Sequence, residues 1–279
     1  MIEARTWSQA DTARFVRVPS AEDDKYSRGV VALRTGSGAY PGAAVLGVEA
    51  AWRAGAGFVR FFGDGRAADA VLARRPETVV GAIAGAGAGA RVDAWVIGSG
   101  TDAAARSSTD AQELARIVAG RTAVVIDAGA LDLAAAATAP FVITPHAGEL
   151  ARMQSALGLP ARERREDAVV EMARTVGGAV LLKGSRTLIA DPDGALIAVE
   201  ESTSWLATAG TGDVLAGAIG AVIAADPQAD PAAAAAAGAW LHGRAGRIAA
   251  GVGAGPAGRP IVALDVADAL PLAIADVLG

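Results

Sequence analysis

Residues 206–221 read LATAGTGDVLAGAIGA, a loop of threonine and glycine that runs into a helix of small apolar residues. Gly210 and Gly212 let the backbone adopt positive φ and let a ligand approach the main chain closely. The free amides of the first helical turn, together with the helix dipole, favour an anion at this end. The stretch therefore predicts a phosphate-binding site at a helix N-terminus. It is not a Walker A loop, because no Gly-Lys-Ser/Thr follows.

Asp213 is the one charged residue of this stretch. A carboxylate beside an anion site can accept a hydroxyl proton while a phosphoryl group is transferred. The alternative is an aspartate that only caps or stabilises the first turn of the helix. The motif by itself leaves both interpretations open.

The composition limits the classes of protein to which the chain can belong. It has 279 residues, 52% of them hydrophobic and 20% charged, which predicts a globular fold with a substantial core. A net charge of −5 and only 4% aromatic residues argue against nucleic-acid binding. The absence of cysteine excludes disulfides and thiolate metal sites. The first residues lack the apolar core of a signal peptide, and apolar runs fall short of the roughly 20 residues of a membrane span. We therefore expect a soluble cytoplasmic protein without membrane contact.

Short β-branched runs alternate with alanine-rich helical stretches along the whole chain, which predicts an α/β fold. We expect an open, mostly parallel sheet with helices on both faces, in one domain over residues 1–279. Asp-Gly in DPDG (191–194) predicts a hairpin, and ligands are expected at the carboxyl ends of the strands. GAGAGA (85–90) is expected to form a loop or a frayed helix. The predicted strands are 30–33, 58–62, 79–83, 95–97, 123–126, 141–143, 179–182, 188–190 and 196–199, and the predicted helices are 43–54, 103–119, 162–176, 214–225, 232–250 and 262–270.

Two further segments carry groups suited to chemistry. The run Lys183, Gly184, Ser185, Arg186 and Thr187 offers cations and hydroxyls for phosphate or ribose contacts. The alternative is an ordinary hairpin turn with a solvated lysine.

The segment TPHAGE (144–149) places His146 and Glu149 three residues apart, on one helix face. These two residues can act in a site or merely cap the helix. His242, within an alanine-rich helix, is interpreted as structural, and two histidines without cysteine make a zinc site improbable. The small-residue loops 36–38 and 98–100 can accept a flat ligand or simply connect strands to helices. Asp127 can hold magnesium through water or cap a loop.

Taken in order, these segments resemble the ADP/ATP-dependent NAD(P)H-hydrate dehydratase family of the ribokinase-like superfamily. The resemblance covers about residues 25–250 and implies a three-layer α/β/α fold. Members phosphorylate the hydroxyl of hydrated NADH or NADPH with a nucleotide, and loss of phosphate then restores the reduced cofactor. The composition looks bacterial, so the resemblance implies ADP as co-substrate and AMP and phosphate as products. The segments that carry it are KYSRG (25–29), PGAAVLGVEAAWRAGAGFV (41–59), VIGSG (96–100), VIDAGAL (125–131), TPHAGE (144–149), LLKGSRT (181–187) and TAGTGDVLAG (208–217).

The resemblance also implies roles for single residues. Asp213 is the base on the hydrate hydroxyl and contacts the hydrate. Glu149 helps to organise Mg²⁺ indirectly. The family further implies a homotetramer. The epimerase domain that is fused to some relatives is not expected within residues 1–279. The remaining hydrate contacts are Ala43, Gly100 and His146, and the nucleotide contacts are Lys183, Gly184, Ser185, Arg186, Thr187, Gly210, Thr211 and Gly212.

Some positions differ from the family pattern. Ala209 stands where a further glycine is common, which is compatible with the anion site if this residue avoids positive φ. VIDAGAL (125–131) lacks the second acid that is usual in the family, so the resemblance does not by itself assign metal binding to this segment. Two rival functions share the same motifs: a small-molecule kinase of the same fold, acting on a vitamin precursor or a sugar, and a non-catalytic nucleotide-binding protein.

Overall fold

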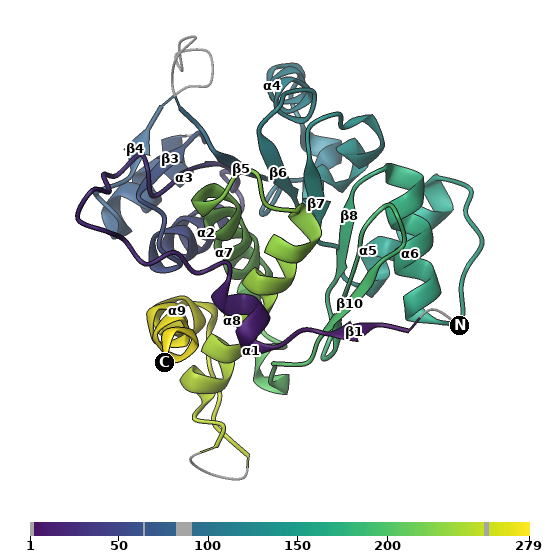
Figure 1. Cartoon of the computed structure of the whole chain (residues 1–279). Helices are drawn as coiled ribbons and strands as arrows, with labels where there is room; N and C mark the ends of the chain where they lie inside the picture. Colours follow the sequence, from purple (N-terminus) through teal and green to yellow (C-terminus); the bar gives the residue numbers. More distant parts are fainter. Residues whose placement is uncertain (1–2, 64, 82–90, 254–256) are drawn as a thin grey trace.

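The sheet of the described residues has ten strands, in the order β1-β10-β9-β8-β7-β6-β5-β2-β3-β4 (Figure 1). The computed structural model describes residues 3–63, 65–81, 91–253 and 257–279. The strands are β1 (Arg5–Thr6), β2 (Val30–Arg34), β3 (Phe58–Phe61), β4 (Val79–Val80), β5 (Ala94–Ile97), β6 (Ala123–Ile126), β7 (Phe141–Ile143), β8 (Ala179–Leu182), β9 (Thr187–Ala190) and β10 (Leu196–Val199).

Strand β9 runs antiparallel to both of its neighbours, β8 and β10, and the other neighbouring pairs within the described sheet are parallel. The predicted hairpin at residues 191–194 is confirmed, because Asp191 accepts hydrogen bonds from the Gly194 and Ala195 amides between β9 and β10. The predicted mostly parallel sheet is confirmed as well. The carboxyl ends of β2, β5, β6 and β7 therefore meet at one edge, where a ligand site is expected.

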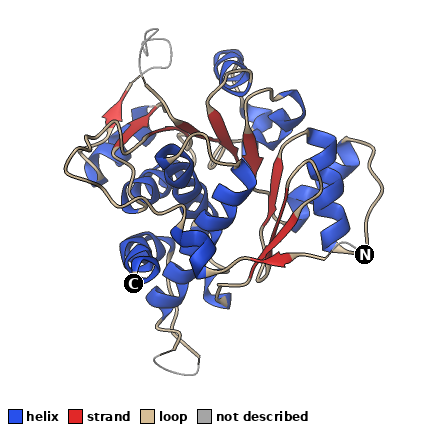
Figure 2. Ribbon diagram, in the orientation of Figure 1, coloured by secondary structure: helices blue, strands red, loops and turns tan. Residues whose placement is uncertain are grey.

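Helices cover the sheet (Figure 2) and create an apolar core on each face. Alternate residues of one strand enter different cores. Val125 belongs to the core that contains residues of α2, α7, α8 and α9, whereas Val124 and Ile126 belong to the core that contains residues of α4, α5 and α6. The helices are α1 (Gln9–Ala13), α2 (Pro41–Arg53), α3 (Gly65–Arg74), α4 (Ser108–Val118), α5 (Ala147–Ala156), α6 (Arg165–Val176), α7 (Thr211–Ala225), α8 (Pro231–Ala250) and α9 (Ala263–Leu278), with 3-10 turns η2 (Ala103–Ala105), η3 (Ala128–Ala136) and η4 (Ser204–Leu206).

The small residues of α7 allow it to lie at the centre of the first core. Each residue from Val214 to Ala224 is buried. A methyl group on Gly217 would lie 2.2 Å from the Gly47 carbonyl of α2, and one on Gly220 would lie 2.5 Å from Val96 of β5. Only glycine permits this approach, so the composition of α7 reflects its close packing between α2 and the sheet.

Three predicted elements require correction. The predicted helix 103–119 is broken, because the Asp102 and Ser107 side chains cap two separate elements, η2 and α4. The predicted helix 262–270 instead continues through Pro271 to Leu278, where Ala273 and Val277 remain buried. Strand β4 ends at Val80, and the rest of the predicted strand 79–83 includes residues outside the described ranges, as does GAGAGA (85–90).

Elements β1, α1, α3, η3 and η4 were not predicted, and two of them, β1 and α1, are only two and five residues long. Within the described ranges, none of the helices combines the length and the apolar character that crossing a bilayer requires.

Glu49 of α2 is a fully buried carboxylate that is held by three arginines. It accepts hydrogen bonds from Arg53 at 3.1 Å, from Arg74 at 3.2 Å and from Arg75. Burial by itself opposes ionisation, but the arginine hydrogen bonds outweigh it and lower the pKa of Glu49 to about 2. The cluster joins α2 to the end of α3 by charge as well as by packing.

Glu49→Gln is expected to lower the free energy of unfolding by about 2 kcal/mol, because it removes charge-assisted hydrogen bonds. Because the folded pKa lies below the unfolded value of 4.5, this stabilisation is present above pH 4.5 and is lost as the pH falls toward about 2. Urea unfolding at pH 7 and at pH 3 measures both effects. Glu77→Gln is the matched control, since Glu77 contacts Arg75 at the surface, and it should change stability by less than about 0.5 kcal/mol. Equal effects of the two substitutions would contradict this account.

Candidate active site

The N-terminus of α7 presents free backbone amides at the carboxyl edge of the sheet. Gly210 precedes the helix with φ 89°, which favours glycine, and makes no side-chain cap. The amides of Asp213 and Val214 both donate to the Gly210 carbonyl, at 3.1 and 3.2 Å. Within the described part of the chain, the amides of Thr211 and Gly212 donate to no acceptor. Two free donors at a positive helix end provide a site for an anion.

Ala209 does not have the positive φ that would have disturbed this turn, because the one non-glycine residue with positive φ among those described is Ala128. Ala209 therefore avoids positive φ, which was the condition for an intact anion site with alanine at this position.

The Asp213 carboxylate is half-buried and makes no hydrogen bond or ion pair with the described residues. It lies in the first turn of α7 but does not cap it, so the capping interpretation of its side chain is wrong. Burial, followed by the negative charge of Asp127, raises the pKa of Asp213 to about 6, and the Lys183 ammonium opposes this rise. The carboxylate is thus ionised at neutral pH but basic enough to accept a proton.

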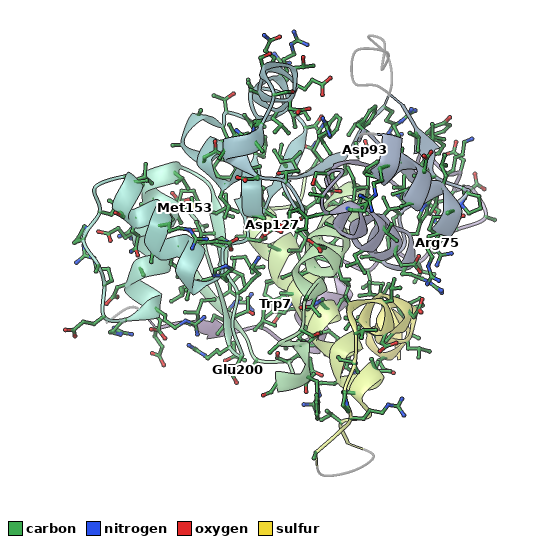
Figure 3. All side chains as sticks on the ribbon, turned by 180° about the vertical axis from the view of Figure 1, so that it is seen from behind. Trp7, Arg75, Asp93, Asp127, Met153 and Glu200 are labelled. Atoms are coloured by element: carbon green, nitrogen blue, oxygen red, sulfur yellow. The ribbon has the colours of Figure 1, made fainter. Side chains whose placement is uncertain are left out.

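Asp127 is buried at the carboxyl end of β6, near the centre of the molecule (Figure 3). It accepts hydrogen bonds from the Ser99 hydroxyl at 2.9 Å, the Thr144 hydroxyl at 2.7 Å and Lys183 Nζ at 2.9 Å. These donors follow β5, β7 and β8, so Asp127 joins four strand ends. A methyl group on Gly212 would lie 3.6 Å from Lys183 Nζ, so the held ammonium faces the anion site of α7.

A pocket of about 880 Å³ lies on one side of the α7 N-terminus, and we call it the nucleotide pocket. Most of the residues that were predicted to contact the nucleotide line it. Arg186 does not, since its side chain pairs with Glu166 at 3.0 Å and Glu200 at 3.1 Å. Gly210 lies outside this lining as well, at the turn before the helix. The predicted residues in the lining are Lys183, Gly184, Ser185, Thr187, Thr211 and Gly212.

A second pocket of about 730 Å³ lies on the other side of the same helix end, and we call it the acceptor pocket. It brings together Ala43, Gly100, Gly210 and Asp213. A methyl group on Gly100 would lie 2.4 Å from Ala43 Cβ, so the two small residues pack directly against each other. Asp213 therefore faces one pocket, while the neighbouring Thr211 and Gly212 face the other.

His146 and Glu149 form a reciprocal cap at the start of α5. His146 Nδ1 accepts from the Gly148 and Glu149 amides at 3.0 and 3.3 Å, and Glu149 accepts from the His146 amide at 2.8 Å. The capping interpretation is therefore confirmed for both residues. The His146 side chain is exposed and lines neither the nucleotide pocket nor the acceptor pocket. Its predicted contact with the hydrate stays a prediction.

Among the described residues, no group of three or more carboxylate, histidine or cysteine side chains could hold a metal ion. The oxygens of Asp127 are already hydrogen-bonded, and Glu149 lies 3.8 Å from Lys183 Nζ. Such a donor set fits Mg²⁺ only in its usual mode, in which water and substrate phosphates are most of the ligands and one protein carboxylate assists.

The sequence reasoning missed several residues of the nucleotide pocket. His242 of α8, which was interpreted as structural, lines this pocket. The segment Glu201–Ala207, between β10 and α7, forms much of its remaining wall. The one signal in the sequence is that His242 is a polar residue within an otherwise alanine-rich, buried helix.

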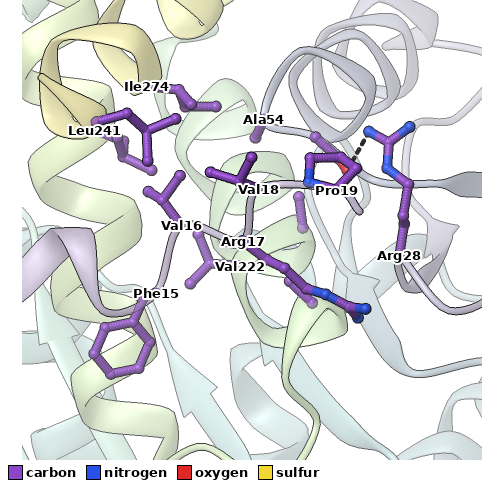
Figure 4. A pocket seen from close by; sticks show the side chains of 14 residues that line it. Phe15, Val16, Arg17, Val18, Pro19, Arg28, Ala54, Val222, Leu241 and Ile274 are labelled. Atoms are coloured by element: carbon purple, nitrogen blue, oxygen red, sulfur yellow. Dashed lines mark hydrogen bonds between the residues drawn. The ribbon is translucent and has the colours of Figure 1, made fainter. Parts of the chain in front are cut away.

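A third pocket, shown in Figure 4, lies between the segment that follows α1 and the helices α7, α8 and α9. Its wall is mostly apolar and includes Phe15, Val222 and Leu241. Both of its arginines are bonded within the chain, Arg28 to the Gly55 carbonyl at 3.2 Å and Arg17 to Asp23. None of the residues predicted to act in the site lies there.

The sequence is similar to a family model and to known proteins. A family model described as NAD(P)H-hydrate dehydratase matches residues 31–254. The chain is 44% identical over 223 residues to a bifunctional NAD(P)H-hydrate repair enzyme of Mycobacterium tuberculosis, covering 77% of this chain and 45% of that protein. The chain thus spans about half the length of this relative. It is 35% identical over 273 residues to the ADP-dependent (S)-NAD(P)H-hydrate dehydratase of Neisseria meningitidis, covering 91% of this chain and 90% of that enzyme.

The structure resembles that of the ADP/ATP-dependent NAD(P)H-hydrate dehydratase of Bacillus subtilis, co-crystallised with ATP and Mg²⁺. The TM-score is 0.84 at 26% identity, over 99% of this chain and 100% of the other. The predicted ribokinase-like, three-layer α/β fold is confirmed. The chain belongs to the NAD(P)H-hydrate dehydratase family.

Proposed function

We propose that the chain is an ADP-dependent (S)-NAD(P)H-hydrate dehydratase, which repairs hydrated NADH and NADPH. The observation that carries this proposal is that neighbouring residues at the α7 N-terminus line two different pockets. Asp213 faces the acceptor pocket, whereas the free amides of Thr211 and Gly212 belong to the nucleotide pocket. A proton acceptor and a phosphoryl site thus lie on consecutive residues of one helical turn.

In the proposed reaction, ADP lies in the nucleotide pocket with its terminal phosphoryl group at the α7 amides. The hydrate lies in the acceptor pocket beside Ala43 and Gly100. Asp213 takes the proton of the hydrate hydroxyl as its oxygen bonds to phosphorus, and the bond from phosphorus to the AMP oxygen breaks. The carbon–oxygen bond of the resulting ester then breaks, phosphate leaves, and loss of a proton from the neighbouring carbon restores the ring double bond.

The charges around the site suit this transfer. Lys183 supplies a cation beside the anion site, and Asp127 holds that cation at 2.9 Å. Mg²⁺, when bound, neutralises phosphate charge, and Glu149 is the residue that we propose to assist it through water. The relatives named for ADP or for both nucleotides support nucleotide use. From the family resemblance alone, we further propose a homotetramer in the cytoplasm and a single domain over residues 1–279.

The direct test of the function is to incubate the chain with ADP, Mg²⁺ and hydrated NADH and to follow the near-ultraviolet absorbance of the reduced ring. We expect the absorbance to recover and AMP and phosphate to form in equal amounts. The same mixture without nucleotide is the control, and ATP is tested in parallel. Accumulation of a stable phosphate ester without recovery of absorbance would instead support a small-molecule kinase.

Asp213→Asn is expected to lower turnover by about 10²–10⁴-fold, because it removes the proton acceptor. ADP affinity, measured by calorimetry, should change by less than about threefold, since the amides and Lys183 remain. The folded state is expected to be at least as stable, because the raised pKa means that ionised Asp213 destabilises the fold above pH 6. Asp226→Asn, at the other end of α7, is the matched control. Turnover that survives Asp213→Asn would remove this residue from the mechanism.

The dependence of kcat/KM on pH tests the charge that Asp127 contributes. The wild-type value should rise with pH through about 6 and level off above it, as Asp213 loses its proton. Asp127→Asn should move the midpoint to lower pH, because it removes a negative charge that raises the pKa of Asp213. Asp132→Asn, at an exposed ion pair with Arg106, should leave the midpoint unchanged. A midpoint that does not move in Asp127→Asn would show that this coupling is negligible.

A further inference from the structure

Arg165 is the first residue of α6, and it contacts the loop 183–187 that forms part of the wall of the nucleotide pocket. Its guanidinium donates hydrogen bonds to two main-chain carbonyls of this loop. Nη1 donates to the Arg186 carbonyl at 3.1 Å, and Nη2 donates to the Lys183 carbonyl at 3.4 Å. Among the described residues, no carboxylate forms an ion pair with Arg165. The guanidinium therefore holds the main chain of the loop and not an acid.

The helix that carries Arg165 is fixed against the two strands that the loop connects. Val169 and Met172 of α6 are buried in the same core as Leu182, the last residue of β8, and Leu188 of β9. The loop leaves the sheet after β8 and returns to it at β9. Arg165 therefore projects from an element whose position relative to both ends of the loop is fixed by packing.

Arg165 holds the loop from a side that does not belong to the pocket. Gly184 lines the nucleotide pocket, whereas Arg165 does not. A methyl group on Gly184 would lie 2.5 Å from Arg165 Nη2, so the guanidinium lies directly against the main chain at this residue. The Arg186 side chain reaches the same end of α6, where it pairs with Glu166 at 3.0 Å. Two successive residues of α6 thus hold the loop.

The bond to the Lys183 carbonyl determines the direction of the next amide. This carbonyl and the N–H of Gly184 belong to one trans peptide group, in which the two point in opposite directions. Because the carbonyl is held toward Arg165, the Gly184 N–H points away from the arginine. Within the described ranges, this N–H donates to no acceptor. A free donor is therefore kept in one direction at a residue of the pocket wall.

The groups around the Gly184 amide select the kind of acceptor that it can bind. Lys183 is the preceding residue, and a methyl group on Gly212 would lie 3.6 Å from Lys183 Nζ. The free amides of Thr211 and Gly212 belong to the same pocket. A cation and several N–H donors without acceptors suit the oxygens of a phosphate, which accept hydrogen bonds and carry negative charge.

On this geometry, and on the proposed function, we infer that Arg165 is a positioning residue that directs the Gly184 amide at a phosphate oxygen of the bound ADP. Arg165 itself does not touch the nucleotide. It acts through the peptide group between Lys183 and Gly184, whose carbonyl it holds and whose N–H binds the phosphate.

Arg165→Met tests this role, because it removes the donors and keeps an unbranched side chain. We expect the KM for ADP, and the Kd of ADP measured by calorimetry, to rise about fivefold, as misdirection of one hydrogen bond to a charged group predicts. The KM for the hydrate and kcat should change by less than about twofold, since the acceptor pocket and Asp213 do not depend on this loop.

Arg174→Met is the matched control, because Arg174 is an exposed arginine of the same helix that also lies against a glycine of a turn. That glycine, Gly194, lies in the turn between β9 and β10 and lines neither the nucleotide pocket nor the acceptor pocket. The control should bind ADP as the wild-type chain does. Equal ADP binding by Arg165→Met and Arg174→Met would overturn the inference. A rise in the KM for the hydrate that equals the rise for ADP would overturn it as well, because it would indicate a general loss of structure.

Arg165→Lys separates the direction of the amide from the effect of charge. Lysine keeps the positive charge, but its single nitrogen cannot hold two carbonyls as the planar guanidinium does. We expect ADP to bind at least about twofold more weakly than to the wild-type chain and more tightly than to Arg165→Met. Wild-type affinity in Arg165→Lys would show that charge alone is sufficient and would overturn the inference while leaving the proposed function intact. Failure of the wild-type chain to bind ADP would overturn both.

Discussion

Close packing of α7 against α2 and the sheet is the constraint on which the rest of the structure depends. The helix is buried from Val214 to Ala224, and glycines at 217 and 220 bring its backbone against Gly47 and Val96. A helix held in this way cannot shift along its axis without creating overlaps on both sides. Its N-terminus is therefore fixed at the carboxyl edge of the parallel strands, and the amides of Thr211 and Gly212 keep one direction.

The charges around that helix end depend on one another. Asp127 is buried at the centre of the strand ends and holds Lys183, while its own negative charge raises the pKa of Asp213. A lysine without this partner would be free to pair with Asp213, and a paired carboxylate is a weaker base. Asp127 thus keeps the cation beside the phosphoryl site and the proton acceptor unpaired.

The two pockets meet at the first turn of α7. Thr211 and Gly212 line one pocket, and the next residue, Asp213, lines the other. The nucleotide pocket supplies amides and Lys183, whereas the acceptor pocket supplies small residues and one carboxylate. Ala43 and Gly100 carry no large side chain, which is compatible with the flat ligand that we propose for this pocket. The imidazole of His146 caps α5 and is not part of the lining of the acceptor pocket.

The sequence by itself was enough for the mostly parallel sheet and for the position of the anion site, because both depend on local signals. Buried parallel strands are continuous apolar runs, and Gly-Thr-Gly-Asp before a helix determines its own backbone turn and free amides. The sequence was not enough to predict the break between η2 and α4, which depends on Asp102 capping η2 and Ser107 capping α4. The sequence also left open whether His146 acts as a helix cap. It did not predict that Arg186 forms ion pairs with two glutamates or that His242 lines the nucleotide pocket. These outcomes depend on which side chains from distant segments meet, and only the tertiary structure decides this, because burial and hydrogen-bond partners are properties of the packed chain and not of local sequence.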